Sequence, residues 1–145
     1  MAFEIEHLGG RLVGVVMASP MTVDDILTGA KKIRAILGVS PGQQFLFATD
    51  VRELGVIPSE VQDAITKMME SDNPQVAFNG LWGNRRSQSS LTAFRLIHQV
   101  GNPNRQVFLS HHELFAALQP RLTNVELMSL QQFINKRLKA ATSTP

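Results

Sequence analysis

Short apolar runs rich in β-branched residues alternate along this chain with longer segments whose apolar residues recur at helical spacing. The β-type runs begin at Phe3, Leu12, Phe45, Val76 and Gln106. The helical patterns begin at Thr22, Pro58, Ser89, Ser110 and Thr123. Strand–helix–strand units of this length require parallel strands joined by right-handed crossovers. The alternation therefore predicts an α/β fold with a mixed, mostly parallel, five-stranded sheet.

The first two β-type runs differ from the others because only Gly9 and Gly10 and a few polar residues separate them. Such a short connection predicts an N-terminal β-hairpin, so the first strand is the antiparallel member of the sheet. Glu4 and Glu6 share one face of that strand, which places it towards a sheet edge.

Capping signals mark the start of several helices. The pattern of a hydroxyl residue followed three positions later by an acidic one occurs at Thr22–Asp25, Ser110–Glu113 and Thr123–Glu126. Ser59 follows Pro58 at the start of the second helical pattern, and the spacing leaves open whether it caps this helix or lies inside its first turn.

The chain length sets the domain organisation, because 145 residues suit one compact core and are too few for two. We expect residues 1–120 to form the α/β domain. Residues 121–140 read as an amphipathic helix packed on the same domain, and residues 141–145 lack apolar periodicity and are expected to fray.

Composition narrows the classes of function. A net charge of +2, with basic residues that share no predicted face, gives no support to nucleic-acid binding. The longest apolar stretch, Leu12–Ala18, is too short for membrane insertion, and the N-terminus shows no export signal. The absence of cysteine excludes disulfides and thiolate chemistry and fits a reducing compartment, so we expect a cytoplasmic protein. We also predict that the protein has no cofactor.

Polar residues gather in the loops that follow the strands, where open α/β sheets bind their ligands. Asn84, Arg85 and Arg86 precede a predicted helix start, and their guanidinium groups together with the free helix amides favour an anion. The alternative is a plain solvated turn, because the P-loop pattern is missing.

Two further candidates are weaker. Asp50, at the end of the third strand, occupies the position of a receiver-domain phosphoacceptor, but the acidic pair and lysine that this chemistry requires are missing, so we expect it to cap its own turn. His111 and His112 are adjacent and point about 100° apart on a helix, which does not suit a metal site. We predict neither a metal site nor catalytic residues.

The element order from residue 3 to 118, with Phe45–Asp50, the helix from Pro58-Ser59 and the ending Val107–Leu114, resembles the STAS group. This is the sulfate-transporter and anti-sigma-factor-antagonist fold, and the chain resembles especially its divergent bacterial SpoIIAA-like members. The resemblance implies that Ser59 occupies the position of the phosphorylatable residue. The chain departs from the family signature, because Glu60 follows Ser59 and the signature glycine is absent.

These observations together predict a non-catalytic signalling or regulatory module that binds a protein partner at the carboxyl edge of its sheet. The expected contact residues are Ile57, Pro58, Ser59, Asn84, Arg85 and Arg86. The alternative is a receptor for a small anionic or nucleotide-like ligand at Arg85 and Arg86. Homodimer formation is left open.

Overall fold

The structure, a computed structural model, describes residues 2–84 and 88–143. The elements follow the order β1 (Phe3–Gly9), β2 (Leu12–Met17), α1 (Val23–Gly38), β3 (Phe45–Asp50), α2 (Ser59–Asp72), the 3-10 turn η1 (Asn73–Gln75), β4 (Val76–Trp82), α3 (Gln88–Val100), β5 (Arg105–Phe108), α4 (His111–Leu118), the 3-10 turn η2 (Gln119–Arg121) and α5 (Asn124–Ser143).

A single five-stranded sheet organises the described chain, with the strands in the spatial order β1-β2-β3-β4-β5. β1 runs antiparallel to β2, with Ile5 opposite Val15, and the remaining neighbours are parallel. β1 lies at one edge. The predicted α/β class, the mixed sheet and the edge position of the first strand are therefore confirmed.

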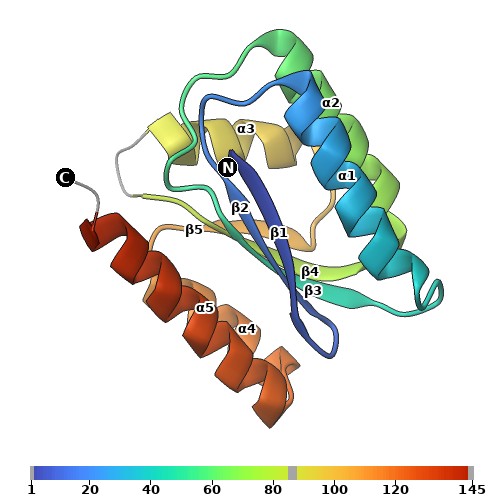
Figure 1. The fold of residues 1–145 in the computed structure, drawn as a ribbon, viewed down its shortest axis with the longest axis vertical. Coiled ribbons are helices and arrows are strands. Elements are labelled where there is room, and N and C mark those ends of the chain that lie inside the picture. The colour runs from blue at the N-terminus through green and yellow to red at the C-terminus, as the bar shows by residue number, and fades with distance from the viewer. Residues whose placement is uncertain (1, 85–87, 144–145) are drawn as a thin grey trace.

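The helices form a layer on each face of the sheet (Figure 1). Each parallel strand lies next to its predecessor in the chain, so all three crossovers advance in the same direction. Right-handed crossovers that advance in one direction place their helices on one face. α1, α2 and α3 accordingly cover one face, and α4 and α5 cover the other.

The central strands feed two separate cores. On β2, Val13 and Val15 pack against the layer of α1, α2 and α3, whereas Leu12 and Val16 pack against α4 and α5. All six residues of β2 and all six of β3 are buried, as expected for strands covered on both faces. The first core is completed by Ile26, Ile33, Ile65, Met69 and Leu96, and the second by Leu114, Leu118, Leu130, Phe133 and Ile134.

All three helices begin where the capping signals predict, and two of the three form the complete capping box. Thr22 and Asp25 exchange both hydrogen bonds of a capping box at α1, and Thr123 and Glu126 do so at α5. At α4 the Ser110 hydroxyl accepts from the Glu113 amide, but the Glu113 carboxylate accepts from the amide of Leu109 instead of that of Ser110.

The C-terminal helix is longer than the sequence indicated. α5 continues to Ser143, beyond the segment 121–140 that was expected to form it, and the fraying of residues 141–145 stays a prediction. Ala140 and Ala141 favour continuation of the helix, because alanine has the highest helix propensity of the residue types.

Candidate functional site at the carboxyl edge of the sheet

A polar cluster occupies the edge where β3 and β4 end, and its centre is the buried carboxylate of Asp50. Arg52 donates from Nε to Oδ1 and from Nη2 to Oδ2, each at 3.0 Å, and its backbone amide donates to Oδ1 at 3.1 Å. Arg137 of α5 donates from Nε to Oδ2 at 2.9 Å. The amide contact confirms that Asp50 caps its own turn.

Burial raises the pKa of the Asp50 carboxyl, but the hydrogen bonds from Arg52 and Arg137 outweigh that effect and hold the pKa below its ordinary value. Asp50 is therefore ionised at neutral pH. Two guanidinium groups against one carboxylate leave the cluster with a positive charge, and both arginine side chains remain partly open to solvent.

Trp82, at the end of β4, forms the apolar wall of this cluster and is buried, as expected for a strand tryptophan. The guanidinium of Arg52 stacks over its ring, and the His111 ring meets it edge-on at a centroid distance of 5.8 Å. Burial, His112 and Arg52 together lower the pKa of His111, so this imidazole is neutral at pH 7. At pH 7 His111 therefore adds no positive charge to the cluster.

The loop 51–58, between β3 and α2, is attached to the body of the protein along its length. Val51, Leu54 and Ile57 are buried. The amide of Gly55 donates to Ser19 Oγ at 2.8 Å, and its carbonyl accepts from Thr92 Oγ1 at 3.1 Å. These contacts fix the loop and leave Val56 and Pro58 exposed on it, with Ser59 exposed beside them at the start of α2.

The predicted site residues are distributed along this loop and beyond it. Ile57 points into the core and Pro58 is the N-cap of α2. Ser59 is the first residue of the helix, and no side chain caps the helix start. This places Ser59 inside the first turn, the second of the two positions that the sequence allowed.

Asn84 lies at the opposite end of the loop from Ser59. Its Nδ2 donates to the carbonyl of Arg52 at 3.2 Å, and its own carbonyl accepts from Ser90 Oγ. The structure thus brings Asn84 to the Arg52 cluster. Arg85 and Arg86 fall outside the described residues.

Sequence reasoning did not identify Arg52 or Arg137 as site residues. For Arg52 the signal was present, because an arginine two residues after a strand-end aspartate can reach back to the carboxylate. Arg137 is 87 residues from Asp50, and only the packing of α5 on the sheet brings it there.

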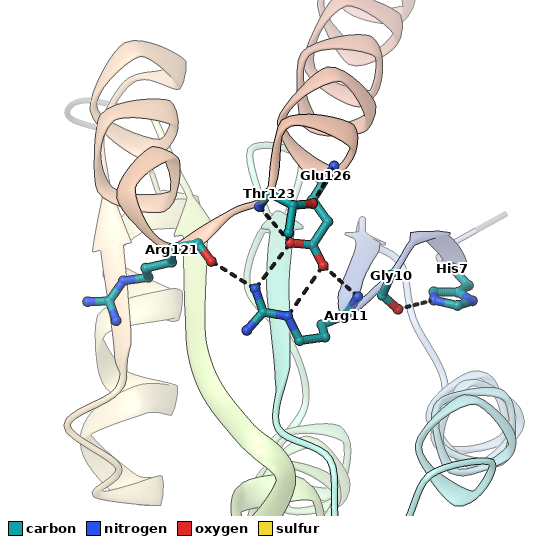
Figure 2. Close-up of polar contacts among 6 residues, drawn as sticks. All are labelled: His7, Gly10, Arg11, Arg121, Thr123 and Glu126. Carbon is teal, nitrogen blue, oxygen red and sulfur yellow. Dashed lines mark hydrogen bonds and ion pairs between the residues drawn. The ribbon is translucent and has the colours of Figure 1, made fainter.

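A second polar cluster lies at the opposite edge of the sheet, where the hairpin turn meets the start of α5 (Figure 2). Glu126 accepts from the amide of Arg11 at 2.7 Å, from its guanidinium at 3.1 Å and from the amide of Thr123 at 2.9 Å. Burial raises the pKa of Glu126, but these hydrogen bonds lower it to about 2. Arg11 also donates to the carbonyl of Arg121. Because these groups satisfy one another, the cluster anchors α5 to the hairpin.

Two classes of site find no candidate in residues 2–84 and 88–143. No three histidine or acidic side chains of these segments gather in a way that would hold a metal ion. None of their helices combines the length and the apolar character that crossing a bilayer requires.

No protein-family model matches the chain, and a search of curated proteins finds no relative.

Proposed function

We propose that this chain is a non-catalytic regulatory module, of the STAS or SpoIIAA-like type found in bacterial signalling, that binds a protein partner at the carboxyl edge of its sheet. The observation that carries the proposal is the attached loop 51–58, which presents Val56 with 79% of its surface exposed, next to exposed Pro58 and Ser59. A cytoplasmic location is part of the same proposal.

The loop has the properties of a preformed contact surface. Its buried residues and its hydrogen bonds to Ser19 and Thr92 fix the backbone, so binding would cost little ordering entropy. An exposed aliphatic side chain held on a rigid loop offers apolar area that a partner can bury. Arg52 and Arg137 lie at the base of the loop and favour an acidic partner surface.

Ser59 suits a role as phosphoacceptor in this module. It is exposed at the first position of α2, where the helix amides have no side-chain cap. A phosphate there would gain from the helix dipole and would place about two negative charges beside Val56. Glu60 repels such a group, which limits the gain and leaves the change in surface charge as the main effect.

The test compares capture of partners by the wild type, Val56→Asp and the matched control Val39→Asp. Val39, the C-cap residue of α1, is 83% exposed. The control therefore places the same charge on a valine that is exposed to a similar extent. Immobilised protein is incubated with lysate of the source organism, and bound proteins are quantified by mass spectrometry, which also reports phosphorylation of Ser59. We expect a partner that the wild type and the control retain and Val56→Asp loses. Equal capture by all three would refute the proposed contact.

One observation favours a second candidate, a receptor for a small anion. The carboxyl edge holds two partly exposed guanidinium groups against one carboxylate. Phosphate and nucleotides should then raise the melting temperature of the wild type more than that of Arg137→Gln, at matched ionic strength. Equal shifts for both proteins would exclude an anion site that uses Arg137.

A further inference from the structure

An open apolar groove of about 480 Å³ runs between α1 and α2, in the helix layer that covers the first face of the sheet. Figure 1 shows these two helices lying side by side. The apolar lining comes from Val23, Ile26, Leu27, Ala30, Ala64 and Met68. Leu27 leaves 51% of its surface open to solvent, although it is a large aliphatic residue on an amphipathic helix. The groove is therefore an apolar surface without a partner inside the described chain.

The charged residues that line the groove are sorted by sign along its length. α1 and α2 are parallel, because both follow parallel strands of the same sheet. Glu60 and Asp63 lie in the first half of α2, whereas Lys67 lies in its second half. Arg34 belongs to the last turns of α1 and is close enough to Asp72, the last residue of α2, to act on its pKa. One end of the groove is acidic and the other end is basic.

We infer that this groove is an interface between two copies of the chain related by a two-fold axis. A two-fold interface requires a surface that is complementary to itself after rotation. The axis would lie in the interface and cross the middle of the groove at right angles. Rotation about it sets the acidic end of one copy against the basic end of the other. Glu60 and Asp63 then face Arg34 and Lys67 of the second copy twice over, and the two Leu27 side chains become covered.

The sorted charges also explain why a second copy is favoured over another partner. A surface of a single sign would be repelled by one end of the groove, at a cost in free energy. The complementary surface needs an apolar centre and the reverse order of charges, which the same groove supplies when rotated. The groove shares no residue with the carboxyl-edge cluster, so this inference does not depend on the proposed function.

The experiment uses two charge-reversed variants of the full chain and sedimentation velocity. Glu60→Lys/Asp63→Lys makes the charged lining entirely basic, and Arg34→Glu/Lys67→Glu makes it entirely acidic. We expect the wild type to be dimeric, each variant alone to be monomeric, and an equimolar mixture of the two to form a heterodimer. The control Lys31→Glu/Lys32→Glu reverses two exposed charges of α1 outside the groove and should remain dimeric.

The outcomes separate the alternatives. A wild type that stays monomeric up to about 1 mM would overturn the inference. Variants that remain dimeric alone would place the interface on another face, and monomeric variants that fail to associate on mixing would exclude the two-fold arrangement. If circular dichroism shows that a reversed variant is unfolded, Leu27→Asn decides instead: it should be monomeric, and a dimer would overturn the inference.

Discussion

The guanidinium carbon of Arg52 lies 3.7 Å from the centroid of the Trp82 ring while the same group donates two hydrogen bonds to Asp50. Arg52 therefore joins the ends of β3 and β4: the face of its guanidinium stacks on Trp82, and the edge donates to Asp50. A lysine ammonium can reproduce neither the paired hydrogen bonds nor the planar stacking.

Arg52→Lys should consequently destabilise the fold by about 1–2 kcal/mol, because a charge-assisted hydrogen bond and the stacking contact are lost. The free energy of unfolding can be followed by the fluorescence of Trp82, the single tryptophan of the chain. The control Arg95→Lys, at an exposed position of α3, should stay within about 0.5 kcal/mol of the wild type. Equal stability of both variants would show that the stack contributes nothing measurable.

Glu126 should determine part of the stability in acid. Its pKa is about 2 in the folded protein, against an ordinary value of 4.5. Between these values the unfolded chain binds a proton that the folded protein does not, so the free energy of unfolding falls as the pH falls. Glu126→Gln should lower the free energy of unfolding by about 2 kcal/mol at pH 7, because a buried charged acceptor is lost. The variant should also show a weaker fall of this free energy with pH in the acid range, here called the acid limb. Urea unfolding as a function of pH measures both effects, and an unchanged acid limb would contradict the prediction.

Asp72 should have the opposite pH dependence. Burial raises its pKa to about 6, although Arg105 and Arg34 pull it down. As the pH falls, the folded protein binds this proton before the unfolded chain does, so the free energy of unfolding rises through pH 6 and the gain is complete below about 3.8. Asp72→Asn should remove this rise and stabilise the protein at pH 8 by roughly 1–2 kcal/mol. A less stable variant at pH 8 would show that attraction to Arg105 outweighs burial.

Gly29 should resist substitution because α1 approaches β1 closely there. A Cβ at this position would collide with the ring of Phe3, which is buried in the same core. Gly29→Ala should destabilise the protein by about 1–3 kcal/mol, the usual cost of overpacking. At Gly42 the same change meets no atom within 4 Å and serves as the control. Thermal unfolding of both variants tests the prediction, and equal melting temperatures would contradict it.

The fold was predictable because its determinants are local. The short apolar block from Phe45 to Ala48 predicted a strand covered on both faces, and the structure buries all six residues of β3. Helix starts followed from hydroxyl and acidic residues three positions apart, as at Thr22 and Asp25. Where the box at α4 formed only in part, the Glu113 carboxylate had a second amide within reach, that of Leu109, which spacing alone does not reveal.

The candidate site was predictable only in outline. Strand ends indicated which edge would hold it, but contacts between distant segments determine which side chains are available there. Ile57, one of the expected contact residues, is buried in a loop whose Gly55 binds Ser19 and Thr92. Arg137 reaches Asp50 only because α5 packs across the second face of the sheet.

The anchoring of α5 to the hairpin by Arg11 and Glu126 also has a consequence for biosynthesis. α1, α2 and α3 are synthesised between the strands of the sheet and can cover their face early. The opposite face, with Leu12, Leu46 and Phe78, is covered by α4 and α5, which are synthesised last. A product that stops before Asn124 would lack Leu130, Phe133 and Ile134, so it would leave part of this apolar face uncovered and tend to aggregate.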